Sequence, residues 1–158
     1  MNNQDFEKKC EEYVERIAKE LDDIVCGGTD IDDLQSELDD LEIDEPERDN
    51  YELQVDFDNA HADWENKIDE LRERIEETEE NTLEKYFEDY LDLSYIINSS
   101  KEYESVRVWV ALGGPNVYVD TDKGAVVLNW DSTHKEHYIR FDTRDAIDEY
   151  FREIYEFC

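Results

Sequence analysis

The sequence lacks the features that mark several common classes of protein. No run of apolar residues approaches the roughly 18 that a membrane-spanning helix requires. The first residues, MNNQDFEKKCEEY, lack the basic-then-apolar order of a signal peptide. Cys10, Cys26 and Cys158 are an odd number of cysteines without CxxC spacing, which supports neither a disulfide framework nor a thiolate zinc site. These absences predict a cytoplasmic protein.

Basic residues are also scarce. The 158 residues include 47 acidic and 16 basic side chains, a formal net charge of −31. This charge is larger than solubility requires, and it predicts repulsion from nucleic acids and anionic lipids. Three explanations are compatible with it: adaptation to high salt, binding of cations, and binding to a strongly basic protein.

The charge is concentrated in the first two-thirds of the chain. Residues 1–100 contain 35 acids and 9 bases, whereas residues 101–158 contain 12 acids and 7 bases. The densest stretch, DIDDLQSELDDLEIDEPE at residues 30–47, has ten acids and no base. Adaptation of the whole surface to salt would spread the charge more evenly, so this distribution argues against the high-salt explanation.

The acids do not match a calcium-binding pattern. An EF-hand loop beginning at Asp120 would need Gly at position 6 and Glu at position 12, but DTDKGAVVLNWD has Gly124 at position 5 and Asp131 at position 12. His134 and His137 have HxxH spacing without the HExxH arrangement of zinc proteases. The sequence therefore predicts no specific metal site, and weak binding of divalent cations remains open.

Catalytic patterns are missing as well. No Ser or Cys nucleophile stands near a His in a recognisable pattern. The Gly113-Gly114-Pro115 turn precedes a strand rather than a helix, so it lacks the backbone donors of a phosphate-binding loop. We therefore predict neither an enzyme nor a bound cofactor.

The first hundred residues have the apolar period of amphipathic helices. A first helix, ended by Gly27-Gly28, has its apolar positions at Phe6, Cys10, Val14, Ile17, Leu21 and Ile24. A second, capped by Thr29 or Asp30, has Ile31, Leu34, Leu38 and Leu41. A third has Trp64, Ile68, Leu71 and Ile75, and a fourth, starting near Thr82, has Leu83, Phe87, Tyr90 and Leu91. The segment YELQVDF, residues 51–57, fits either a short strand or a helical turn.

From Glu102 the apolar period changes to two, which indicates strands. Turns at GGPN and Asp122-Lys123-Gly124 separate the strands of an antiparallel meander. A last helix, capped by Asp142 or Thr143, follows the strands. The predicted fold is α+β: N-terminal acidic helices, then a meander of three or four strands with the C-terminal helix packed on it. We expect two regions: an acidic, mostly helical region at residues 1–100, and the sheet with the C-terminal helix at residues 101–158. The alternative is that both belong to one continuous domain.

The outer faces of the acidic helices are the candidate partner-binding site. In a helix, the acids between Lys19 and Arg48 would average about 3 Å of axis per charge, close to the ~3.4 Å per phosphate of one DNA strand. The first group of candidates is Asp30, Asp32, Asp33, Glu37, Asp39, Asp40, Glu42, Asp44 and Glu45. The second group is Glu76, Glu77, Glu80, Glu84, Glu88, Asp89 and Asp92.

A chain with these properties resembles the small, very acidic DNA mimics of phages and mobile elements, which block restriction enzymes or CRISPR effector nucleases. The likeness is one of size, charge and helical acidic surface. In addition, LEKYFEDYLDLSYII, VRVWVALGGPNVYVDTDKGAVVLNW and DAIDEYFREIYE, within residues 83–156, are similar to small uncharacterised proteins of Gram-positive phages and conjugative elements. This second resemblance implies a mobile-element origin, and neither resemblance assigns a role to an individual residue.

The expected function is therefore inhibition of a bacterial defence nuclease, a CRISPR effector or a restriction enzyme, with carboxylates occupying its Lys- and Arg-lined groove. The partner is a basic nucleic-acid-binding protein, and we expect no direct contact with nucleic acid or membrane; a homodimer remains open. Trp109, Tyr118 and Trp130 are interpreted as core residues, or alternatively as residues that select the nuclease. The alternative function is an acidic adaptor or chaperone for a basic cellular protein.

Overall fold

The structure, a computed structural model, describes residues 2–27 and 30–157. The chain forms two compact units. The first consists of residues 1–27 together with 82–158, and the second of residues 28–81. Among the described residues, no helix combines the length and the apolarity needed to cross a bilayer.

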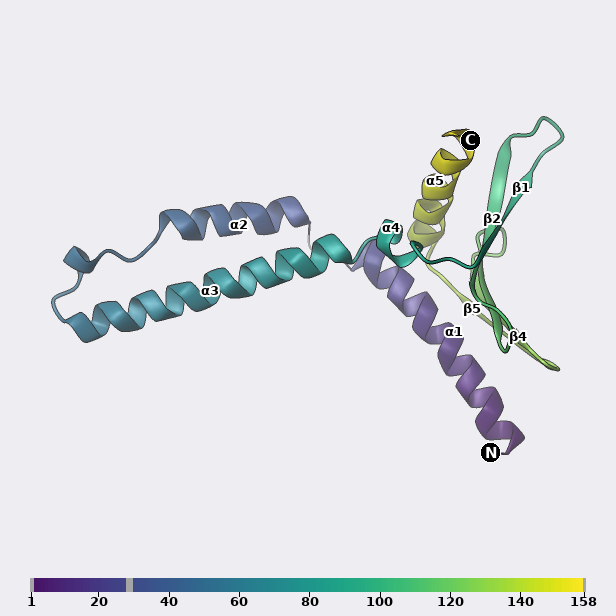
Figure 1. The fold of residues 1–158 in the computed structure, drawn as a ribbon, viewed down its shortest axis with the longest axis horizontal. Helices are drawn as coiled ribbons and strands as arrows, with labels where there is room; N and C mark the ends of the chain where they lie inside the picture. Colours follow the sequence, from purple (N-terminus) through teal and green to yellow (C-terminus); the bar gives the residue numbers. More distant parts are fainter. Residues whose placement is uncertain (1, 28–29, 158) are drawn as a thin grey trace. The chain divides into compact units, whose positions relative to one another are not determined.

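The first unit contains an antiparallel sheet with strand order β1-β2-β3-β4-β5 (Figure 1). Its strands are β1 (Asp92–Ile97), β2 (Tyr103–Ala111), β3 (Asn116–Asp120), β4 (Ala125–Trp130) and β5 (Thr133–Tyr138). Each strand pairs with the next in the chain, so the sheet is a simple meander, as the alternating apolar residues predicted. Gly113 and Gly124, at φ 101° and 67°, occupy turn positions that favour a residue without Cβ.

Most of the fourth helix that we expected is instead a turn, and this turn leads into β1, a strand beyond the three or four that we expected. Only α4 (Leu83–Tyr86) is helical there. Phe87 is buried against Phe151, with ring centroids 5.3 Å apart. Beyond it, Leu91 N–H donates to the Trp109 carbonyl at 2.8 Å, and β1 begins. Pairing with β2 therefore overrides the helical spacing that the apolar residues suggested.

Two long helices cover one face of the sheet: α1 (Asn3–Cys26) and α5 (Phe141–Phe157) (Figure 1). The core between the layers is made of alternate strand residues and the apolar stripes of the helices. Its members include Cys10, Val14, Leu21, Val106, Val108, Val119, Val126, Leu128, Ile147 and Phe151. Because α1 supplies part of this core, the compact units do not follow the boundary at residue 100 that we expected.

Asp22 of α1 is hydrogen-bonded to the start of α5. Its Oδ1 accepts hydrogen bonds from Arg140 N–H at 2.9 Å and from the Thr143 hydroxyl at 2.6 Å. We expected Asp142 or Thr143 to cap α5, but the Thr143 hydroxyl donates to Asp22 instead. Near the middle of α5, Tyr103 donates to Asp148 at 2.6 Å, which ties the helix to β2.

The second unit is a helical hairpin of α2 (Ile31–Ile43) and α3 (Gln54–Glu80), joined by a loop that contains the short helix η1 (Arg48–Asn50) (Figure 1). Asp30 accepts from Asp32 N–H at 3.0 Å and caps α2, as expected; Gly28 and Thr29, also named at this boundary, lie outside the described residues. The seam between the helices is formed by Ile31, Leu34, Leu38, Leu41, Trp64, Ile68, Leu71 and Ile75. Segment 51–57 contains no strand: α3 begins at Gln54, so the second half of the segment is helical, as the alternative had it.

Candidate functional site

The helical hairpin holds a disproportionate share of the negative charge. Residues 28–81 contain 23 acidic and 4 basic side chains, a formal net charge of −19, whereas the other 104 residues contain 24 and 12. All 23 of these acids are exposed. The hairpin is therefore the most acidic surface of the chain.

Helix α2 fixes the first group of candidate residues. Asp32, Glu37, Asp39 and their neighbours lie outside the leucine seam, which holds the helix against α3. Asp30 and Asp44 are the residues at its two ends, and Glu45 follows in the loop. The periodic leucines thus do what the sequence predicted: they bury one face of the helix and hold the carboxylates outside.

The second group of candidate residues does not form one helical face. Glu76, Glu77 and Glu80 lie on the last turns of α3, in the hairpin. The remaining four belong to the other compact unit, and they are Glu84, Glu88, Asp89 and Asp92. Glu84 is in α4, and the chain then turns before it reaches β1, which begins at Asp92. The expected helix over this stretch is wrong because the chain turns into the sheet after Phe87. The candidate site accordingly narrows to the hairpin.

Helix α3 carries a third set of acids that we did not predict as part of the site. They occupy the solvent side of the helix whose seam residues are Trp64, Ile68, Leu71 and Ile75. The same period that defined the seam also places these acids outside it, so the signal was present in the sequence. The set is Asp56, Asp58, Asp63, Glu65, Asp69, Glu70 and Glu73.

The packed helices reach a charge density close to that of DNA. The stretch of α3 beside α2, residues 64–80, spans about 25 Å at ~1.5 Å per residue. Together with α2 it carries 14 carboxylates. This is about one per 1.8 Å of axis, compared with about one charge per 1.7 Å in duplex DNA. After subtraction of the three bases in the stretch, the spacing is about 2.3 Å per net charge.

Few of these carboxylates are neutralised within the hairpin. In the described part of residues 28–81, the only ion pair with Lys or Arg joins Arg72 to Glu42, at 3.3 Å. His61 Nε2 lies 3.6 Å from Glu45 Oε1, and His61 Nδ1 lies 3.5 Å from Glu65 Oε1. Arg48 instead donates to Gln54 and to the Tyr51 carbonyl, which shapes the loop. Most of the negative charge is thus left facing solvent.

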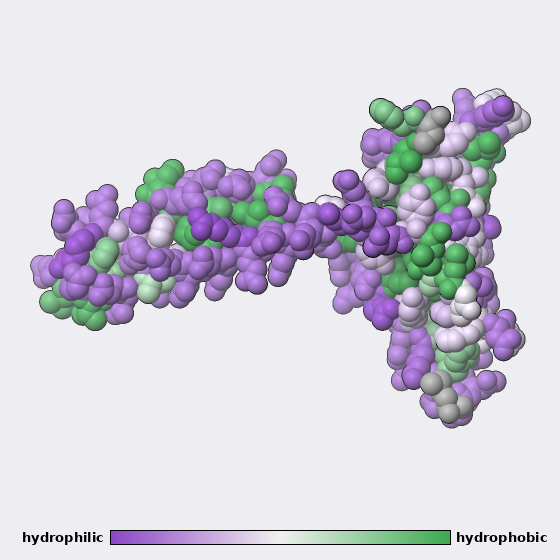
Figure 2. All heavy atoms as spheres, in the orientation of Figure 1, coloured by the Kyte–Doolittle hydropathy of each residue, from purple (hydrophilic) through white to green (hydrophobic). Residues whose placement is uncertain are grey.

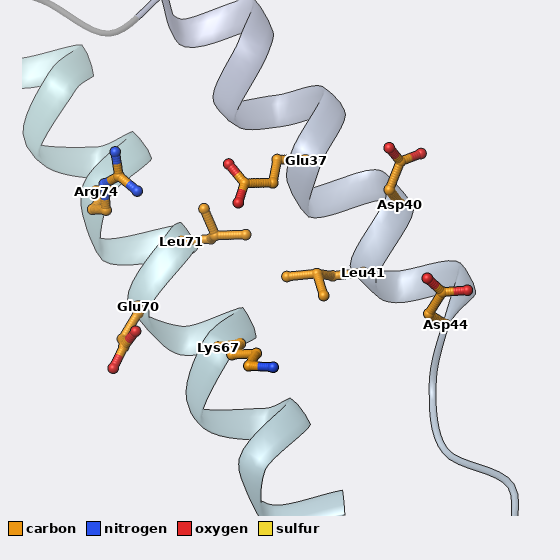
Figure 3. A pocket seen from close by; sticks show the side chains of 8 residues that line it. All are labelled: Glu37, Asp40, Leu41, Asp44, Lys67, Glu70, Leu71 and Arg74. Atoms are coloured by element: carbon orange, nitrogen blue, oxygen red, sulfur yellow. The ribbon is translucent and has the colours of Figure 1, made fainter. Parts of the chain in front are cut away.

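A groove of about 500 Å³ runs between α2 and α3 (Figure 3). Leu41 and Leu71 point toward each other across it, Lys67 extends into it, and Asp40 points away. Its other lining residues are Glu37, Asp44, Glu70 and Arg74. Apart from the two leucines, these lining residues are all charged, so the groove is suited to polar contacts with a partner.

The residues considered for metal binding are engaged in other contacts. The Asp120 carboxylate is buried, pairs with Arg107 Nε at 3.1 Å and accepts the turn amides of Asp122 and Lys123. His134 contacts Asn129 and Glu136. Across residues 2–27 and 30–157, no cluster of three His, Cys, Asp or Glu side chains is arranged to hold an ion.

The three aromatics considered for nuclease selection are neither core residues nor fully exposed. Trp109 and Tyr118 are half-buried neighbours on β2 and β3, with ring centroids 5.2 Å apart. They alternate with core valines and so lie on the sheet face opposite α1 and α5. Trp130 is 40% exposed and packs on Phe6 in an edge-to-face arrangement, with ring centroids 4.9 Å apart.

Comparison with known proteins gave no match: no family model fits the chain, and no curated protein or solved structure is significantly similar to it. The resemblance to DNA mimics therefore depends on physical character, and function has to be argued from the hairpin.

Proposed function

We propose that this protein inhibits a bacterial defence nuclease, either a CRISPR effector or a restriction enzyme, inside the host cell. The acidic hairpin occupies a Lys- and Arg-lined groove that otherwise binds DNA or RNA. The observation that carries the proposal is the density of fixed carboxylates on two packed helices, about one per 1.8 Å. Carboxylates there stand in for phosphates.

The placement of the acids favours a binding role over a stabilising one. Both hairpin helices lack a basic residue in the last turn, where a cation would interact well with the helix dipole. The last turns instead hold acids, including Glu42, Glu77 and Glu80. Like charges at these positions cost folding free energy, so a selective advantage must come from a partner that supplies positive charge.

A basic groove is the partner that fits best. Its Lys and Arg side chains would attract the hairpin over long range and accelerate association. Nucleic acid and anionic membranes would be repelled by the same charge. The hairpin needs no catalytic group to act in this way, since occupying the phosphate contacts is enough to exclude the nucleic acid.

The experiment is a competition assay with a purified CRISPR effector and a purified restriction endonuclease. Labelled DNA is bound to each nuclease, and fluorescence anisotropy follows its release as this protein is added. We expect release from at least one nuclease, weakening at least tenfold between about 50 and 200 mM salt, because the contacts are ionic. Retention of DNA by both nucleases at low salt would refute the proposal.

A pair of charge-reversed variants tests the hairpin itself. The test variant replaces four α2 acids by Lys, at Asp32, Asp33, Asp39 and Asp40. The control makes the same charge change in the other compact unit, at Glu104, Glu149, Glu153 and Glu156, which are all exposed. We expect the test variant to lose DNA release and the control to keep most of it. Equal losses would mean that net charge alone matters.

The same competition assay distinguishes a nuclease inhibitor from the alternative, an adaptor or chaperone. An adaptor or chaperone for a basic protein would bind with similar salt dependence but would have no reason to displace DNA. A nuclease that binds this protein and DNA at the same time would support the adaptor.

A further inference from the structure

The loop end of the hairpin departs from the pattern of the rest of its surface. Residues 30–81 contain ten Ile, Leu and Val side chains, of which seven lie in the seam between α2 and α3. The other three are exposed: Ile43 by 81%, Leu53 by 59% and Val55 by 58%. All three lie at or beside the loop, and hydrophobic atoms show at this end of the hairpin in Figure 2.

The loop that presents Leu53 and Val55 is ordered by its own contacts. Arg48 donates to Gln54 Oε1 at 2.7 Å and also to the Tyr51 carbonyl. The rings of Tyr51 and Phe57 are in edge contact, with centroids 5.9 Å apart. Leu53 is the residue before α3, and Val55 lies in its first turn. Their exposure is therefore part of the folded loop.

The charges around these two side chains restrict what can cover them. Glu52 and Asp56 are their immediate neighbours in the chain, and both carboxylates are exposed. An anionic lipid surface would be repelled by these acids, and so would a second copy of the same loop, since the hairpin has a formal net charge of −19. The partner must combine apolar contact with positive charge.

We infer that Leu53 and Val55, here called the apolar tip, enter an apolar pocket at the end of the basic groove that receives the acidic helices. The inference rests on the proposed function and adds a second recognition element to it. The carboxylates supply long-range attraction that salt weakens, and the apolar tip supplies contact that salt does not screen. Such a contact would let the hairpin distinguish one basic groove from another.

The test uses the double variant Leu53→Ser/Val55→Ser in the full chain. Its control is Leu91→Ser/Leu112→Ser, because these leucines are 56% and 48% exposed in the other compact unit. The dissociation constant is measured for the nuclease that releases DNA in the competition assay, between about 50 and 200 mM salt. Circular dichroism checks that each variant keeps its helices.

Salt dependence distinguishes the two kinds of contact. We expect the tip variant to bind about tenfold more weakly at every salt concentration, with an unchanged slope of log affinity against log salt. Charge reversal on α2 should instead reduce the slope. The control should bind like the wild type.

The possible failures are distinguishable. If the wild type releases DNA and the tip variant binds equally well, the apolar tip is not a contact and the proposed function stands. If the wild type releases no DNA from either nuclease, both proposals fail. If sedimentation shows that the wild type dimerises and the tip variant does not, while nuclease affinity is unchanged, the apolar tip mediates self-association and the inference is overturned.

Discussion

The hairpin should unfold separately when its seam is weakened, and Leu38→Ala is the most direct perturbation. Leu38 is 6% exposed and is one of only five buried residues in the seam cluster. Truncating a buried leucine to alanine costs about 2–5 kcal/mol. A 54-residue unit is expected to have about 3–8 kcal/mol of stability, at 0.05–0.15 kcal/mol per residue. The substitution should therefore remove a large part of it.

Hydrogen exchange read by mass spectrometry measures the effect in each unit. We expect faster exchange throughout α2 and α3, while amides of α1 and of strands β2 to β4 keep their protection, because their core contains no seam residue. Ile43→Ala is the matched control, since Ile43 ends the same helix but is 81% exposed. Unchanged exchange in α2 and α3, or equal loss of protection in the sheet, would refute the reasoning.

Two further predictions concern charge. Asp40→Lys should stabilise the hairpin by about 0.3–1 kcal/mol, because it places a cation in the C-terminal half of α2, which has no basic residue in its last turn. Thermal unfolding at low salt measures this gain in stability. A gain that does not shrink at high salt would contradict the electrostatic cause. In the other unit, the hydrogen bond from Lys123, and next that from His134, hold the pKa of Glu136 below its ordinary value of 4.5. The folded-state pKa is the lower one, so Glu136 contributes stability above pH 4.5 that is lost as the pH falls through the folded-state pKa. Wild type should therefore unfold at a higher temperature than Glu136→Gln near neutral pH, and the gap should close on acidification; a constant gap would contradict this assignment.

The sequence was most informative where one apolar period continues without competition. The spacing of Val14, Ile17 and Leu21 predicted α1, and that of Leu34 and Leu38 predicted α2. Both helices end near the expected residues because Gly27 and Pro46 follow them. The strands of residues 103–130 were equally clear, since no helical period overlaps their alternation.

Prediction failed where the two periods overlap. In LEKYFEDYLDLSYII, Leu83 and Phe87 fit a helix, whereas Leu93 and Tyr95 fit a strand. The choice is made by β2, which pairs Leu93 with Val108 and Tyr95 with Val106. Pairing of this kind depends on residues distant in sequence, so local spacing cannot decide it.

The same limit applies to the arrangement of the helices. The stripe on α1 showed that one face would be buried, but its partner could have been any apolar surface. The Asp22 contacts to Arg140 and Thr143 span 118 and 121 residues and have no local signal. The pairing of α2 with α3 was likewise not predicted, although the local spacing of Trp64, Ile68 and Leu71 was enough to place the acids of α3 outside the seam.

Leu38→Ala also tests whether the carboxylates act as a fixed array or only as a polyanion. The substitution leaves the net charge of the chain unchanged, but it releases α2 and α3 from the seam that fixes their average density of about one carboxylate per 1.8 Å of axis. If mimicry depends on that spacing, DNA release should fall in proportion to the unfolded fraction of the hairpin. If release is undiminished when hydrogen exchange shows an unfolded hairpin, the charge acts without the fold, and the packed leucines would need another explanation.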